Sequence, residues 1–95
     1  MPRISRSSGE IIVEMLEVLG SGEELKRSTI AYRCEINYDT ATKKLAILEK
    51  RKWIIRNRNN TYTITEEGKK RLKHAINAFS KLEKIFNGEG HVGHD

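Results

Sequence analysis

The chain has 95 residues, of which 33% are charged and 37% hydrophobic, with a formal net charge of +5 and a pI near 9.5. This length predicts one domain, and the hydrophobic content excludes a chain disordered throughout. One cysteine excludes an intramolecular disulfide, and no apolar run reaches the length of a signal peptide or membrane span, so a soluble cytoplasmic protein is predicted. A basic chain favours an acidic partner such as nucleic acid or an anionic membrane.

The positive charge is concentrated in one segment. Between residues 39 and 58, seven basic residues stand against two acidic ones, so this segment accounts for the whole net charge. Distribution of charge says more about a binding surface than its total, so this segment is the first candidate for contact with an acidic partner.

The first helix is predicted over about residues 8–20. Ser7 and Glu10 form a capping-box pattern at its start, apolar residues follow at helical spacing, and Gly20 with Gly22 supplies a stop.

Two further short helices are predicted, at about residues 26–34 and 38–51. Ile36, in the connection between them, is expected to pack into the core. Asn37 is a good N-cap for the later helix, and Asp39 in the first turn suits the helix dipole. The apolar positions expected to face the core are Leu25, Ile30, Ala31, Cys34, Ala41, Leu45 and Leu48.

The segment "WIIRNRNNTYTIT" changes to strand character and predicts a single hairpin, with Asn59–Asn60 at its turn and no other strand pair. A long helix over about residues 66–87 follows, capped by Thr65, and residues 88–95 are predicted to be a disordered tail. The hydrophobic stripe of this helix predicts a dimer interface made of Leu72, Ala75, Ile76, Phe79, Leu82 and Phe86. The stripe could instead fold back on the first helix of the same chain.

Three short helices followed by a basic hairpin predict a mostly α protein with a small β-hairpin, a winged helix-turn-helix with a long C-terminal dimerisation helix. The expected organisation is a flexible basic arm (1–7), a winged helix-turn-helix domain (8–65), the dimerisation helix (66–87) and the tail (88–95). The helix at 38–51 is the expected recognition helix and the hairpin is the wing.

Two segments, "IAYRCEINYDTATKKLAILEKRKWI" and "YTITEEGKKRL", resemble the archaeal winged-helix proteins of the Sso-ten-a type. The similarity covers roughly residues 10–86, and it includes Ile36–Asn37–Tyr38 at the turn and the Thr65–Gly68 step into the last helix. The resemblance implies DNA binding, architectural or regulatory, by a homodimer joined through an antiparallel coiled coil. The apolar stripe spans about two heptads, which is short for a self-sufficient coiled coil.

Side chains that could contact DNA gather at the start of the recognition helix and at the wing. The candidates are Asn37, Asp39, Thr40, Thr42, Lys43, Lys44, Arg56, Arg58, Asn59 and Asn60. The alternatives are a plain solvated helix face and an edge strand that charge protects from pairing.

Other residues leave two interpretations open. The cations of the run Lys50–Lys52 could bind DNA, or they could be favoured there by the helix dipole alone. Arg3 and Arg6 could follow the DNA backbone or be disordered. The aromatic residues could stack on single-stranded bases, but core positions are favoured for all of them. These aromatic residues are Tyr32, Tyr38, Trp53 and Tyr62.

The sequence predicts no enzyme, no cofactor and no metal site. It contains no Gly-rich phosphate loop or Ser/His/Asp arrangement, and His91 with His94 in the tail lacks a completing ligand cluster. The favoured function is double-stranded DNA binding by a nucleoid-associated homodimer that regulates transcription. The alternatives are an architectural chromatin protein and a winged-helix module that binds other proteins, with single-stranded RNA binding as a weaker third.

Overall fold

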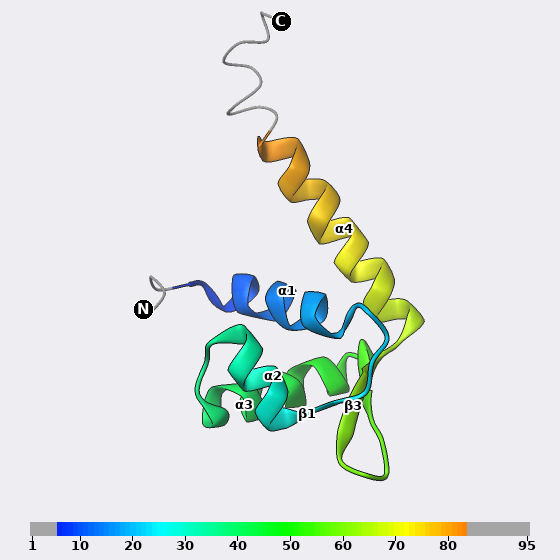
Figure 1. Cartoon of the computed structure of the whole chain (residues 1–95). Coiled ribbons are helices and arrows are strands. Elements are labelled where there is room, and N and C mark those ends of the chain that lie inside the picture. Colours follow the sequence, from blue (N-terminus) through cyan, green and yellow to red (C-terminus); the bar gives the residue numbers. More distant parts are fainter. Residues whose placement is uncertain (1–5, 84–95) are drawn as a thin grey trace, which may run out of the picture.

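Figure 1 shows three short helices packed with a small sheet, and a fourth helix that extends away from them. The computed structural model describes residues 6–83, with side chains described as far as residue 78. The elements, in chain order, are α1 (Ser8–Leu19), β1 (Leu25–Lys26), α2 (Arg27–Cys34), α3 (Tyr38–Lys50), β2 (Ile54–Arg56), β3 (Thr61–Ile64) and α4 (Glu66–Glu83). The predicted disordered tail and the predicted last turn of the long helix lie outside the described residues.

Side chains cap three of the helices as the sequence predicts. Ser7 and Glu10 form the reciprocal capping box of α1, and Asn37 accepts a hydrogen bond of 2.7 Å from the backbone N–H of Thr40 at the start of α3. Thr65 accepts from the backbone N–H of Gly68 at 3.0 Å and caps α4. Each cap satisfies an N–H group that a helix start leaves without a partner, so the starts of these helices are determined locally.

The sheet has three strands, so the prediction of a single hairpin was wrong. The strand order is β1-β3-β2, and both pairs are antiparallel, with Leu25 opposite Tyr62 and Ile54 opposite Ile64. β1 has only two residues and precedes α2 directly, so no alternating pattern in the sequence could reveal it. Its pairing brings the start of α2 beside the wing.

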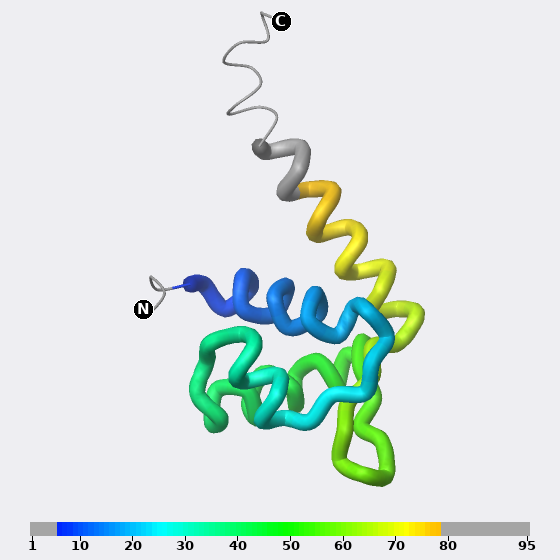
Figure 2. The backbone as a smooth tube through the Cα atoms, viewed as in Figure 1, coloured from blue at the N-terminus to red at the C-terminus, as the bar shows by residue number. Residues whose placement is uncertain are grey.

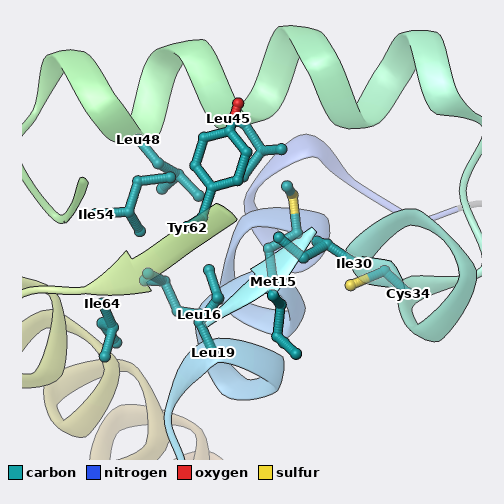
Figure 3. Packing of buried hydrophobic residues seen from close by; sticks show 11 residues of the cluster. Met15, Leu16, Leu19, Ile30, Cys34, Leu45, Leu48, Ile54, Tyr62 and Ile64 are labelled. Carbon is teal, nitrogen blue, oxygen red and sulfur yellow. The ribbon is translucent and has the colours of Figure 1, made fainter. Parts of the chain in front are cut away.

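The core lies between α1, α2, α3 and one face of the sheet (Figure 3). Met15, Leu19, Ile30, Leu48 and Ile54 are all buried, and Cys34 lies among them as the sequence predicts. Ile36 is partly buried against this cluster, as expected for the connection between α2 and α3. The core is therefore built by the apolar faces that the helical spacing indicates.

Two of the four aromatic residues do not occupy the predicted core positions. Tyr62 is buried, with 2% of its surface exposed, and Trp53 is half-buried, but Tyr32 is 84% and Tyr38 55% exposed. The core prediction was wrong for Tyr32 because the α2 face turned inward is formed by Ile30, Ala31 and Cys34.

α4 is fixed to the rest of the domain at its first turns. Gly68 lies so close to the backbone carbonyl of Trp53 that no larger residue fits, and Leu72 packs against the core. Leu72, which was predicted in the dimer stripe, is therefore partly buried within its own domain. Beyond this point α4 runs away from the domain (Figure 2).

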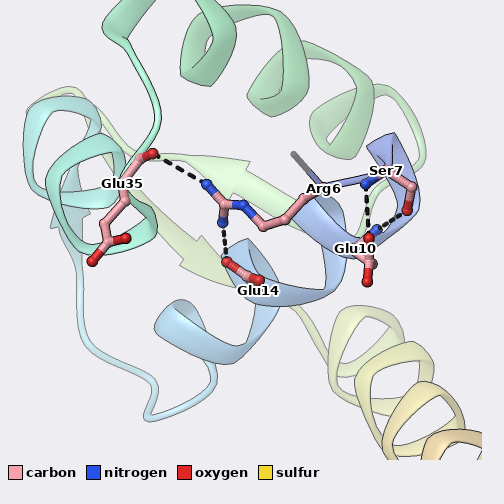
Figure 4. Close-up of polar contacts among 5 residues, drawn as sticks. All are labelled: Arg6, Ser7, Glu10, Glu14 and Glu35. Atoms are coloured by element: carbon pink, nitrogen blue, oxygen red, sulfur yellow. Dashed lines mark hydrogen bonds and ion pairs between the residues drawn. The ribbon is translucent and has the colours of Figure 1, made fainter. Parts of the chain in front are cut away.

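The N-terminal segment is held at Arg6, the first residue described. Its guanidinium contacts the carboxylate of Glu14 on α1 and donates to the backbone carbonyl of Glu35 at 3.1 Å (Figure 4). Glu35 follows the last turn of α2 with a φ of 56°, so Arg6 places a cation where that helix presents its free carbonyl groups. Arg3 lies outside the described residues.

Candidate nucleic-acid interface

The outward face of α3 is a continuous stripe of exposed residues. The stripe consists of Asp39, Lys43, Ala46, Ile47 and Lys50. The spacings between successive members are four, three, one and three residues, so they lie on one side of the helix. Lys43 lies 3.3 Å from Asp39 in an ion pair, and both side chains are more than 70% exposed. An exposed pair of this kind contributes little to stability, so Lys43 can leave it for a phosphate or a base at small cost.

The polar residues at the start of α3 are partly engaged in structure. Asn37 uses its side-chain oxygen in the cap, which leaves its amide N–H₂ free to donate. The Thr42 hydroxyl donates to the Tyr38 carbonyl at 2.9 Å, and Thr40 is half-buried. Among these residues, Asn37 and Lys43 have the donors best placed to meet a ligand.

The wing tip is a tight turn over residues 57–60. Asn60 has a φ of 62° and donates its backbone N–H to the carbonyl of Asn57 at 3.0 Å, so the prediction of an asparagine turn with positive φ is confirmed. The amide of Asn57 also donates to the hydroxyls of Thr61 and Thr63 at 3.1 and 2.8 Å. These bonds stiffen the turn that carries the exposed Arg58.

The tip is also tied to the segment before β1. Glu24 accepts from the Thr61 hydroxyl at 3.0 Å and from the Asn59 amide at 3.4 Å. Glu24 is an acidic residue close to the wing tip, so the positive potential of the tip depends on Arg58 and on the cations of the neighbouring α2.

An open hollow of about 460 Å³ separates the wing tip from the starts of α2 and α3. It is lined by Lys26, Arg27, Ser28, Tyr38, Asn59 and Asn60. The pairing of β1 with β3 produces this hollow, because it places Lys26 opposite Thr61. Two cations, two amides and two hydroxyls therefore converge from segments that are distant in the sequence.

Arg27 joins all three elements of this surface. Its guanidinium donates to the Tyr62 hydroxyl at 2.9 Å and to Thr42 Oγ1 at 3.3 Å, and it lies over the Tyr38 ring at 5.5 Å from the centroid. The hydrogen bond to Tyr62 raises the pKa of Arg27 above its ordinary value, against the lowering effect of burial. Within residues 6–83 no carboxylate contacts this guanidinium, and its buried Nε has no hydrogen-bond partner. A permanent positive charge without an acidic neighbour attracts an anion.

The structure does not bring all the predicted residues to this surface. Lys44 contacts the Ser8 hydroxyl at the start of α1, on another side of α3. Arg56 lies 3.9 Å from Glu49 and is about half exposed. Lys26 and Arg27 were missed by the sequence reasoning, because only the long-range pairing of β1 places them beside the wing.

The chain belongs to the winged helix-turn-helix family, whose model matches residues 5–84. No curated protein matches the sequence. Within residues 6–83, no helix is long and apolar enough to cross a membrane, and no group of His, Cys, Asp and Glu side chains could hold a metal ion.

Solved structures share this fold at low sequence identity. A protein of unknown function from Listeria innocua superposes with a TM-score of 0.65 at 20% identity, covering 82% of this chain and 58% of that one. Ligand-free NadR gives 0.62 at 19% identity over 85% and 65% of the two chains. A variant of Lactococcus lactis ZitR gives 0.66 at 18% identity over 94% and 68%. At these identities the likeness shows the fold alone, and this chain spans less than two thirds of the first two proteins.

Proposed function

We propose that this protein binds double-stranded DNA as a homodimer and regulates transcription. The observation that carries the proposal is the hollow in which Lys26 and Arg27 meet the wing turn at Asn59–Asn60. Two further exposed cations lie on the elements beside it, Lys43 on α3 and Arg58 in the wing turn. In a winged helix-turn-helix the recognition helix enters the major groove, and these cations then meet the phosphates on either side.

The outward stripe of α3 would read the bases. Lys43 can donate to guanine, the free amide N–H₂ of Asn37 can donate to base acceptors, and the Ile47 side chain can contact a thymine methyl. Arg58 at the stiff wing tip fits the minor groove, where a narrow groove increases the negative potential. Arg27 would hold the recognition helix and the wing at a constant separation, because it bonds to Thr42 on one and to Tyr62 on the other.

The dimer is proposed to form through α4. Ile76 is 46% exposed and Ala75 half-buried on the part of α4 whose side chains are described. The side chains of Phe79 and Leu82 and the whole of Phe86 lie outside the described residues. The resemblance to archaeal proteins with a C-terminal coiled coil supports this interface, and Ile76→Glu is expected to shift sedimentation equilibrium towards monomer. A wild-type chain that sediments as a monomer at high concentration would refute the interface.

Duplex binding measured against salt tests the DNA proposal. Fluorescence anisotropy with random and selected duplexes should give a steep negative slope of log K against log salt. A selected site bound at least ~10³-fold more tightly than random DNA indicates a specific regulator. A steep slope without preference indicates an architectural chromatin protein, and no binding at low salt would exclude DNA as the partner.

One observation favours a second function, binding of another protein. Tyr32 on α2 is 84% exposed and is not among the residues that line the hollow. Tyrosine is enriched at protein interfaces. Tyr32→Ala should leave DNA affinity unchanged if Tyr32 serves only a protein partner. We propose no catalytic role.

A further inference from the structure

We propose that a second basic surface, at the base of the wing, binds the phosphate backbone of the same duplex beside the segment that α3 contacts. This wing-base cluster consists of Lys50, Arg51 and Lys52 at the end of α3 with Arg71 of α4, and Arg51 and Arg71 both lie over the Trp53 ring. The proposal rests on the proposed function, because it requires a bound duplex.

The backbone at the end of α3 shows that glycine is the residue that the local structure favours at position 52. The N–H of Lys52 donates to the Glu49 carbonyl and the N–H of Trp53 to the Leu48 carbonyl, both at 3.0 Å, which is the hydrogen-bond pattern of a Schellman motif. Lys52 occupies the left-handed position of this motif with a φ of 63°. A residue with a side chain is strained in this conformation and glycine is not, so the lysine reduces stability.

The three consecutive cations of the cluster, Lys50, Arg51 and Lys52, are not neutralised by neighbouring acids. Glu49 is adjacent in sequence but pairs with Arg56, and within residues 6–78, whose side chains are described, no carboxylate contacts Lys50, Arg51 or Lys52. The dipole of α3 favours cations here only weakly, and neighbouring cations repel one another. The helix end therefore does not explain three consecutive cations.

Trp53 gathers two of the cations at one place. The guanidinium carbons of Arg51 and Arg71 lie 5.3 and 5.6 Å from its ring centroid. Arg71 also lies 3.5 Å from Glu67, which orients it. Two guanidinium groups held on one ring form a preorganised pair of donors for phosphate oxygens.

The position of Lys50 indicates that the cluster meets the same duplex as α3. Lys50 lies seven residues beyond Lys43 on the same exposed face, which is about 10 Å along the helix axis. A duplex that follows this face reaches the wing base directly. The cluster would thus extend the contacted length of backbone without reading bases.

The variant Lys52→Gly tests phosphate binding by the wing-base cluster without destabilising the fold. The substitution removes a charge and relieves the left-handed strain, so the variant should be more stable than wild type. If Lys52 contacts a phosphate in each protomer, the salt slope should fall by about 0.9 per protomer, or about 1.8 for the proposed dimer. The affinity of the dimer near 0.1 M salt should then fall about 60-fold. Lys73→Gln, on the exposed surface of α4, makes the same change in net charge and should leave the slope and affinity nearly unchanged.

The outcomes distinguish the two proposals. If wild type binds no duplex, the proposed function fails. If wild type binds and Lys52→Gly keeps the wild-type slope and affinity, only the wing-base proposal fails. The wing-base cluster could instead bind a second duplex, and a capture assay with one immobilised and one labelled duplex tests this arrangement. If Lys52→Gly loses only the capture of the second duplex, the assignment of the cluster to the same duplex is overturned.

Discussion

The junction between the wing and α4 gives the sharpest test of the structure, through Gly68→Ala. A Cβ at residue 68 would lie 2.1 Å from the Trp53 carbonyl oxygen, 2.8 Å from Ile64 Cγ1 and 3.0 Å from the Trp53 carbonyl carbon. The first of these contacts is far inside van der Waals distance and involves backbone. The start of α4 or the strand before it must therefore move by roughly 1 Å to accept a methyl group.

The expected loss of stability is about 2 kcal/mol. Overpacking of this kind costs about 1–3 kcal/mol, and the movement also weakens the cap in which Thr65 accepts from the N–H of Gly68. The better helix propensity of alanine returns up to about 1 kcal/mol. A net loss near 2 kcal/mol corresponds to a decrease in Tm of about 8–16 °C for a domain of this size.

Thermal and urea denaturation followed by circular dichroism measures this loss. Gly9→Ala is the matched control, because Gly9 also lies in the first turn of a helix but a Cβ there meets nothing closer than 4.0 Å. It should stabilise the protein by up to about 1 kcal/mol. If Gly68→Ala were as stable as wild type, the tight approach of α4 to Trp53 would be refuted.

Substitutions at three further positions test the DNA-facing surface. Tyr62→Phe removes the hydroxyl that accepts from Arg27 and should cost about 1.5–3 kcal/mol in urea denaturation, whereas an unchanged midpoint would show that the bond does not form in solution. Asn37→Ala should cost about 1 kcal/mol and Asn37→Asp much less, because only the aspartate retains an oxygen for the cap of α3. Arg58→Gln should reduce the salt slope of duplex binding by about 0.9 per protomer, or about 1.8 for the proposed dimer, without changing Tm, and an unchanged slope would show that the wing tip does not contact DNA.

The proposed mechanism depends on how the recognition helix and the wing are joined. Arg27 contacts Thr42 and Tyr38 of α3 and Tyr62 of β3, so the three elements move together. A rigid surface loses little conformational entropy on binding, which favours affinity. The same guanidinium also contributes charge to the hollow, so one residue serves both positioning and attraction.

The helices, their caps and most of the core could be read from the sequence. Ser7 with Glu10, Asn37 and Thr65 each bond to a backbone group within three residues, so a local pattern contains all the necessary information. The apolar spacing that buries Leu45 and Leu48 is equally local. A winged helix-turn-helix follows from the order of these elements.

Tertiary structure decided which side chains share the DNA-facing surface. β1 exists because Leu25 pairs with Tyr62, and that pairing alone brings Lys26 and Arg27 to the wing. The same packing leaves Tyr32 exposed. These outcomes depend on contacts between residues 35 or more positions apart, or on which of several apolar faces is buried in the one core, and no short sequence pattern encodes either.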